Sequence, residues 1–163
     1  EIGSGLVGSE MCIRDRGECH GGSMLLHPVV HLHLFNSCGE FYLQKRPAWK
    51  DIQPGRWDTA VGGHVDWGEE PLAALRREVR EEVGVTDFEP QHVLTYLFES
   101  ERERELVYVY KTVYDGPVVP SGELDGGRFW TLREIAEGVG GGIFTPNFEG
   151  EIRRVAELPD VGR

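Results

Sequence analysis

Apolar and polar residues alternate along several short segments of the chain. Residues 29–35 (VVHLHLF) alternate in this way and are rich in β-forming residues, so they predict a strand. The turn-forming sequence NSCG at 36–39, followed by an apolar segment at 41–45, predicts the partner strand of a hairpin. Further short strands are predicted at 59–65, 93–98, 106–114 and 126–131.

The clearest helical pattern lies at residues 71–83. Pro71 suits the first turn of a helix, and Gly84 is of the type that most often follows the last turn. Four apolar residues recur on one stripe of this helix, which predicts its buried face: Leu72, Leu75, Val79 and Val83.

Two further helices are predicted, a short one at 132–137 and another at 146–158, where Thr145 precedes Pro146 as a helix cap. Residues 46–58 contain two prolines, a glycine and two tryptophans, and predict an ordered loop. Strands and helices alternate without a regular βαβ rhythm. The pattern therefore predicts an α/β fold with a mixed sheet and helices on both faces.

Composition narrows the function. The chain has 163 residues with a net charge of −11, which argues against binding to nucleic-acid backbones, because that requires a basic face. No apolar run approaches the ~20 residues of a membrane span, so no membrane partner is expected. Three cysteines do not make a disulfide framework, and the first residues lack the pattern of a secretory signal. A reducing, cytoplasmic location is expected.

The first residues are unusual. The sequence MCIRDR at 11–16 resembles the translation of a transposase sequencing adapter. We therefore expect residues 1–16 to lie outside the packed fold, and residues 17–163 to form a single domain.

The helix at 71–83 carries three acidic residues at spacing i, i+3 and i+4: Glu78, Glu81 and Glu82. Like charges at this spacing repel each other and destabilise a helix by a few tenths of a kcal/mol per pair. Convergent carboxylates are, however, what a hard cation such as Mg²⁺ requires. Arg77 is placed to orient a carboxylate, with Glu69 as its expected partner. Gly63, before the helix, lets the backbone approach a metal or phosphate closely.

The whole pattern resembles the Nudix box, and each position that this motif specifies is matched. The matching residues are Gly63, Glu69, Arg77, Glu78, Val79, Glu81, Glu82, Gly84 and Val85. The resemblance implies an α/β/α sandwich, in which the box forms a loop–helix–loop that holds Mg²⁺ or Mn²⁺. It also implies a small-molecule substrate with a diphosphate linkage, cleaved by water.

On this resemblance Glu78, Glu81 and Glu82 are metal ligands, and Gly63 adds its carbonyl oxygen. Glu81 is the first candidate for the general base, with Glu78 and Arg77 in the same catalytic set. Glu123 is the second candidate, because many family members place a further Glu in such a loop. A solvated loop acid is an equally good interpretation of Glu123.

A subgroup resemblance adds a second candidate metal site. The segments LHPVVHLHLFN, YLQKRP and PGRWDTAVGGH resemble isopentenyl-diphosphate isomerase, a Nudix-fold enzyme that hydrolyses nothing. The resemblance implies that Zn²⁺ or Mn²⁺ is held by His20, His27, His64, Glu103 and Glu105. The alternative is that these histidines belong to a His-rich segment and are structural, as His31 and His33 suggest.

The isomerase also requires a cysteine, and this chain has Gly62 at that position. Glycine cannot replace a thiol, so we expect a diphosphate hydrolase. An isomerase-like enzyme and a non-catalytic nucleotide-binding module are the alternatives. The tyrosine that such an isomerase uses corresponds to Tyr96 or Phe98. Trp57 and Arg46 are candidates for substrate contact, with core packing and plain surface charge as their ordinary roles. The leaving group and the oligomeric state, a homodimer included, stay open.

Overall fold

The computed structural model describes residues 25–49, 53–122 and 126–162, which form one mixed sheet and three helices. The first five elements are β1 (Leu26–Phe35), β2 (Phe41–Lys45), β3 (Trp57–Asp58), β4 (Val61–His64) and α3 (Pro71–Val83). The remaining five are β5 (Gln91–Glu99), β6 (Arg104–Val113), β7 (Gly127–Trp130), α4 (Leu132–Gly138) and α5 (Pro146–Val155).

β1 is the strand on which the sheet is built. It pairs in parallel with β6 along its whole length, and β5 continues the sheet antiparallel to β6. On its other side β1 pairs antiparallel with two strands, first β4 at residues 29–32 and then β2 at residues 34–35. The short strands β3 and β7 pair with β2. The mixed sheet predicted from the sequence is therefore confirmed.

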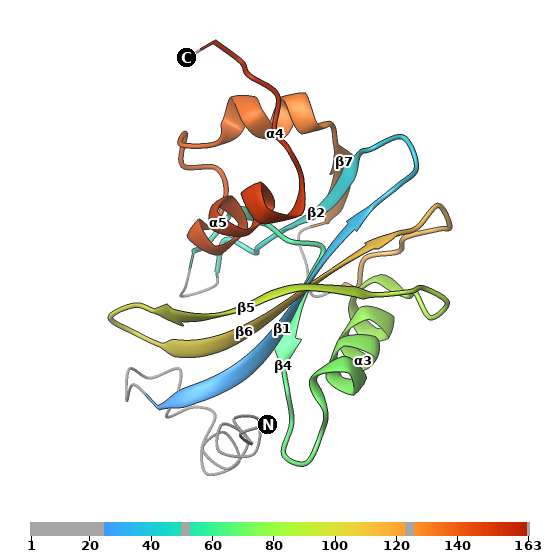
Figure 1. Ribbon diagram of the computed structural model, residues 1–163, viewed down its shortest axis with the longest axis vertical. Helices are drawn as coiled ribbons and strands as arrows, with labels where there is room; N and C mark the ends of the chain where they lie inside the picture. Colours follow the sequence, from blue (N-terminus) through green and yellow to red (C-terminus); the bar gives the residue numbers. More distant parts are fainter. Residues whose placement is uncertain (1–24, 50–52, 123–125, 163) are drawn as a thin grey trace.

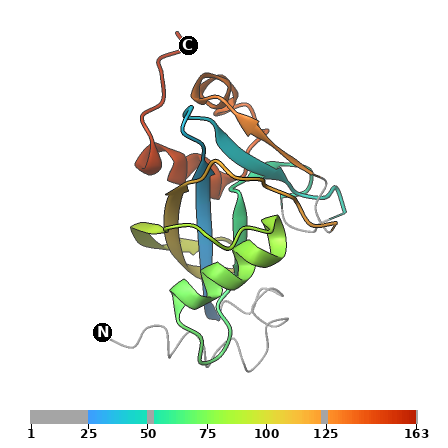
Figure 2. The same ribbon diagram turned by 90° about the vertical axis from the view of Figure 1, so that its right-hand side faces the viewer.

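The helices cover opposite faces of this sheet, as Figures 1 and 2 show together: α3 lies against one face, and α5 packs on the other. Alternation along β1 supplies both cores. Val30, Leu32 and Leu34 point to the core beneath α3, whereas Val29 points to the core beneath α4 and α5. This arrangement is the predicted α/β/α sandwich. No helix among the described residues is long and apolar enough to span a membrane.

α3 begins and ends as its sequence predicts. Pro71 occupies its first turn, and Gly84 takes a left-handed conformation with φ of 70° after its last turn. The predicted stripe needs one correction, because Leu72 is 43% exposed. Ala74, two positions further along α3, is buried instead of Leu72. The buried face of α3 therefore begins at Ala74 and does not include the first turn of the helix.

Several predicted bounds also differ from the structure. β1 and β5 begin three and two residues earlier than predicted, and α5 ends at Val155 rather than at 158. The predicted loop at 46–58 contains β3, since residues 57–58 pair with β2. Backbone pairing extends strands past the point where side-chain alternation is visible in the sequence.

A buried charged network fastens α5 to the sheet. Glu151 of α5 is 2% exposed, and its carboxylate contacts two imidazoles of β1. Its Oε2 lies 2.7 Å from Nδ1 of His31, and its Oε1 lies 2.8 Å from Nε2 of His33. Tyr96 of β5 donates its hydroxyl to Oε2 at 2.5 Å and accepts a hydrogen bond from Asn147 at 2.9 Å. The buried carboxylate is therefore fully hydrogen-bonded, as burial of a charge requires.

Replacing Leu75 by Ala tests the core beneath α3. Leu75 is fully buried, so we expect Leu75→Ala to lower the free energy of unfolding by about 2–5 kcal/mol through lost transfer energy and a cavity. Leu72→Ala on the same helix is the matched control and is expected to cost less than about 1 kcal/mol. Urea denaturation measures both. Equal losses would contradict the assignment of the buried face.

The network on α5 predicts how stability depends on pH. Burial by itself lowers the pKa of His31, but the Glu151 carboxylate and its hydrogen bond outweigh this and raise the pKa from 6.5 to about 9. The stabilisation is complete below pH 6.5 and is lost as the pH rises through 9. Glu151 acts in the opposite sense. Burial raises its pKa, yet His31 and His33 hold the net value far below 4.5, so its contribution is lost in acid.

We therefore expect the free energy of unfolding to fall by an amount on the order of 3 kcal/mol between pH 6.5 and 9. In His31→Asn this part of the fall should disappear. Urea denaturation at several pH values measures both chains, and parallel pH profiles would contradict the prediction. The ionisable groups that face His31 are Glu151, His33, Tyr96, Asp58 and Glu105, all of which stay in the variant.

Candidate active site

The centre of the site is the close approach of α3 to β4. A Cβ atom placed on Gly63 would lie 2.2 Å from Cδ of Glu78 and 2.6 Å from its Oε1. No other residue type leaves room for the carboxylate at this place, because real side chains do not approach so closely. The sequence predicts a close approach of a metal or phosphate at Gly63, and the structure shows the Glu78 side chain there instead.

Glu82 lies beside Glu78 in the same half-buried space. Burial raises the pKa of Glu82 to about 8, and the charge and hydrogen bond of Glu78 add to the rise. The backbone amide of Gly62 and the side chain of Gln44, 3.4 Å from Oε1, donate hydrogen bonds to Glu82 and partly offset it. The two carboxylates are thus held so close together that Glu82 loses its proton less readily than an ordinary glutamate.

Glu81 is placed differently from the other two acidic residues. Its side chain is 55% exposed, and its Oε1 lies 3.7 Å from Nη1 of Arg77. The carboxylates of Glu78, Glu81 and Glu82, all among the described residues, do not converge within 4.8 Å of one another, so the predicted convergence of all three is not present. In this structure the Glu81 side chain therefore points toward solvent and Arg77 rather than toward the other two carboxylates.

Arg77 ties the loop before α3 to the helix. Its Nε and Nη2 donate to the two carboxylate oxygens of Glu69 at 2.8 and 2.9 Å, the bidentate pair that the sequence predicts. Nη2 also donates to the carbonyl oxygen of His64, and Nη1 donates to Glu78 at 2.9 Å. The hydrogen bonds to Glu69 and Glu78 raise the pKa of Arg77 further, so this side chain stays charged. Arg77 therefore fixes Glu78 relative to β4.

These residues fit a hard divalent cation. The donors are carboxylate oxygens, which Mg²⁺ and Mn²⁺ prefer, and the repulsion between Glu78 and Glu82 is what a bound cation relieves.

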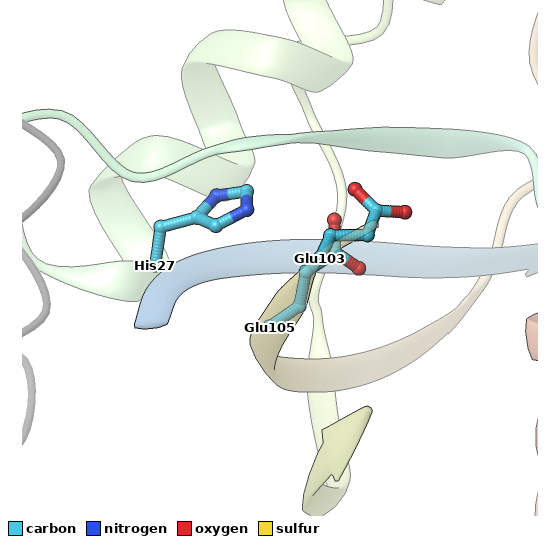
Figure 3. Close-up of side chains that lie close together, drawn as sticks. All are labelled: His27, Glu103 and Glu105. Atoms are coloured by element: carbon cyan, nitrogen blue, oxygen red, sulfur yellow. The ribbon is translucent and has the colours of Figure 1, made fainter. Parts of the chain in front are cut away.

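A second group of candidate ligands lies at the beginning of β6. His27, Glu103 and Glu105 each offer a ligand atom, and these atoms all lie within 4.8 Å of one another. Figure 3 shows the imidazole of His27 and both carboxylates turned toward one another. The pairing of β1 with β6 places His27 directly opposite Glu105, and the alternation of an extended chain brings Glu103 to the same side.

His64 of β4 lies against this cluster, since its ring stacks on that of His27 with centroids 5.0 Å apart. The structure thus brings the ligand atoms of three of the five predicted residues together, with His64 beside them. His20, the fifth, lies outside the described residues. His27 and Glu103 are buried, and a mixed set of imidazole and carboxylate suits Zn²⁺ or Mn²⁺.

The remaining sequence candidates lie as follows. Trp57 packs edge-on against Trp130, with ring centroids 5.2 Å apart, so at least part of its surface serves the core. Arg46 lies 3.9 Å from the carboxylate of Asp58. Glu123 falls outside the described residues, whereas the amide of Ser121, before it in the chain, donates to the carbonyl oxygen of Glu82.

The sequence did not reveal the partner of His31 and His33. Their spacing on β1 indicated a shared face, but Glu151 lies 120 residues from His31 and only the packing of α5 brings it there. Beside this network a pocket of about 300 Å³ opens between β5 and α5. Its wall is made by Leu94, Tyr96, Phe98, Pro146, Asn147, Gly150, Glu151 and Arg154.

Comparison with known proteins places this geometry in a family. Residues 25–148 match the model of the NUDIX domain. An uncharacterized Nudix hydrolase of Pseudomonas aeruginosa is 33% identical over 118 residues, covering 72% of this chain and 66% of that protein. An isopentenyl-diphosphate Delta-isomerase of Serratia proteamaculans is 30% identical over 118 residues, covering 69% and 64%. The chain thus spans just under two thirds of the length of both relatives.

Solved structures agree with the sequence comparison. The crystal structure of DR0079 from Deinococcus radiodurans has a TM-score of 0.67 and 26% identity, and it covers 78% of this chain and 81% of its own. The MutT protein of Methanosarcina mazei has a TM-score of 0.68 and 25% identity, covering 79% and 91%. Together with the box geometry on α3 and β4, these similarities show that the chain belongs to the Nudix hydrolase family.

Proposed function

We propose that this protein hydrolyses a diphosphate linkage in a nucleoside diphosphate derivative or a related small molecule, with Mg²⁺ or Mn²⁺ held by the box residues. The observation that carries the proposal is the pair Glu78 and Glu82, two neighbouring carboxylates of which Glu78 lies against the bare backbone of Gly63 and Glu82 accepts a hydrogen bond from the backbone of Gly62. Such crowding of like charges costs stability unless a cation balances it, so it indicates a binding function rather than a structural one.

The box residues have separate proposed roles in binding the cation and in positioning its ligands. Glu78 and Glu82 bind the cation, Glu81 joins them, and the carbonyl oxygen of Gly63 is the fourth proposed ligand. The bound cation would withdraw charge from the phosphate oxygens and lower the pKa of the attacking water. Arg77 holds Glu78 in place through its bonds to Glu69 and to the carbonyl oxygen of His64.

A carboxylate must accept the proton of the attacking water. Glu81 is the first candidate, because its exposed side chain reaches either the metal ligands or a water beside them. Glu123 is the second candidate. The contact between Ser121 and Glu82 supports it, since it brings the chain near the end of α3 shortly before Glu123.

We further propose that His27, His64, Glu103 and Glu105, together with His20, hold a second divalent ion, Zn²⁺ or Mn²⁺. The convergence of three ligand atoms within 4.8 Å supports this site.

This second cluster favours an alternative function, that of an isopentenyl-diphosphate isomerase-like enzyme, and the 30% identity to such an isomerase supports it. Gly62 argues against the alternative. Isomerisation of an allylic diphosphate requires an acid and a base on either side of the double bond, and glycine supplies neither. Glu105 alone provides one of the two partners. A non-catalytic nucleotide-binding module is disfavoured by the intact set of box carboxylates.

Glu82→Gln tests the hydrolase. The substitution keeps the side-chain shape but removes a metal-binding charge, so we expect hydrolysis to fall at least about 100-fold. The assay measures Mg²⁺-dependent release of phosphate or nucleoside monophosphate from nucleoside triphosphates, nucleotide sugars, ADP-ribose and prenyl diphosphates. Glu70→Gln, at an exposed position just before α3 without a capping hydrogen bond, is the matched control and should leave the rate unchanged. Unchanged turnover of Glu82→Gln at saturating Mg²⁺ would show that the box is not the catalytic centre.

Solvent exchange separates the hydrolase from the isomerase. We expect no incorporation of deuterium from D₂O into isopentenyl diphosphate, together with measurable hydrolysis of at least one nucleoside diphosphate derivative. Mass spectrometry of the recovered substrate measures the exchange. Incorporation well above background that Glu105→Gln abolishes would overturn the hydrolase in favour of the isomerase-like function.

A further inference from the structure

The imidazole of His31 lies against Gly62 of β4, on the side of the sheet that faces α5. His31 and Gly62 are directly paired between β1 and β4. A Cβ atom on Gly62 would meet Cδ2 of His31 at 3.4 Å and Nε2 at 3.7 Å, and apart from the two chain neighbours of Gly62 no other described residue supplies an atom within 4 Å of that point. The edge of the His31 ring that carries Cδ2 and Nε2 therefore faces Gly62 on the α5 side of the sheet.

Among the described residues, Nδ1 is the one nitrogen of His31 that has a hydrogen-bond partner. Nδ1 lies 2.7 Å from the Glu151 carboxylate, and this contact directs the opposite nitrogen, Nε2, toward Gly62. Within residues 25–49, 53–122 and 126–162, Nε2 has no hydrogen-bond partner, and 13% of the side chain stays exposed. A carboxylate that fixes one imidazole nitrogen so that the other faces open space is the arrangement by which proteins present a histidine to a ligand.

The carboxylate that holds His31 cannot turn away from it. Glu151 is buried, and its other oxygen is bound to His33 while Tyr96 donates to the oxygen shared with His31. Asn147 in turn holds the Tyr96 hydroxyl. These contacts hold the carboxylate against Nδ1 and so fix the direction in which the Nε2–H of His31 points.

Gly62 connects His31 to the box. Its backbone amide donates to the Glu82 carboxylate on the α3 side, and its α-carbon faces His31 on the α5 side. Glu78 and Glu82 lie on the α3 side and the His31 ring lies on the α5 side, so a diphosphate bound by a cation at these carboxylates would reach Nε2 of His31 around the edge of β4 at Gly62. β4 has β1 as its only strand partner among the described residues, so no further strand covers its outer edge where the ligand would pass.

We propose that His31 is a further substrate-binding residue, whose Nε2–H donates a hydrogen bond to a phosphate oxygen of the diphosphate beside Gly62. This inference rests on the proposed diphosphate substrate. Glu105 and Asp58 add negative charge around His31, so the ligand is the diphosphate with its divalent cation and not the bare anion. A charged hydrogen bond of this kind strengthens binding by about tenfold or more.

Binding of methylenediphosphonate in the presence of Mg²⁺ tests the proposal without turnover, because its P–C–P bridge resists hydrolysis. Imidazole ¹⁵N spectra of the full chain report on each histidine, and the signals missing in His31→Asn assign His31. We expect the Nε2 signal of His31 to shift on addition of the ligand. Calorimetry then measures the affinity of each variant for the same ligand.

His31→Asn is the informative variant, because its amide keeps a donor for Glu151 at the place of Nδ1 and removes Nε2. We expect it to bind methylenediphosphonate at least about tenfold more weakly. His92→Gln is the matched control, since His92 lies exposed on β5 and contacts Thr95, and it should bind like the unaltered protein. An unshifted Nε2 signal at a saturating ligand concentration, or equal affinities of the unaltered protein and His31→Asn, would overturn the proposal.

The two proposals fail separately. Absence of hydrolysis by the unaltered protein on all diphosphate substrates would overturn the proposed function, whereas the ¹⁵N shift and the affinities report on His31 even without turnover. Conversely, hydrolysis that falls on Glu82→Gln but is accompanied by no response of His31 would leave the proposed function standing and reject only the role of His31.

Discussion

The contact of α3 with the bare backbone of β4 is the constraint on which the rest of the candidate site depends. Gly63 has no side chain, and Glu78 occupies the volume in which one would stand. The helix can approach the strand closely only because of this, and Arg77 then locks the approach by bonding the strand carbonyl of His64 together with Glu69 and Glu78. An added methyl group at Gly63 would displace the carboxylate, the arginine and the loop before the helix together.

The two faces of the sheet treat buried charge in opposite ways. On the α5 face, Glu151 is matched by two imidazoles and a tyrosine hydroxyl, so its pKa falls although burial acts in the other direction. On the α3 face, Glu82 is placed beside Glu78 and its pKa rises to about 8. The first arrangement is complete within the protein and supports the fold. In the second, Arg77 bonds Glu78, but no lysine or arginine among the described residues forms an ion pair with Glu82, and a bound cation would balance this charge.

β1 explains why these groups lie so near one another. Its parallel pairing with β6 sets His27 opposite Glu105, and its antiparallel pairing with β4 sets His31 opposite Gly62. One strand therefore lines up the second candidate metal cluster, the His31–Glu151 pair and the glycine next to the box. The order of these groups along β1 is fixed by strand register, because a slip of one residue would turn each side chain to the other face.

Local patterns in the sequence determined most of the fold and the box. The spacing of Leu75, Val79 and Val83 predicted the buried face of α3, and the sequence between Gly63 and Gly84 predicted the partnership of Arg77 with Glu69, because these contacts join residues close in the chain. The same reasoning failed at Leu72, where the tertiary contact ends before the helical pattern does. The second cluster was visible only through resemblance, since nothing local joins His27 to residues 103–105.

Only the tertiary structure decided the role of the α5 face. Glu151 reaches His31 across 120 residues, and the bareness of Gly62 acquires a meaning only when β1 and β4 pair. A sequence displays alternation and helical period because these repeat within a few residues. The partner of a buried charge is instead chosen by strand register and by the packing of a distant helix, and neither of these leaves a periodic trace along the chain.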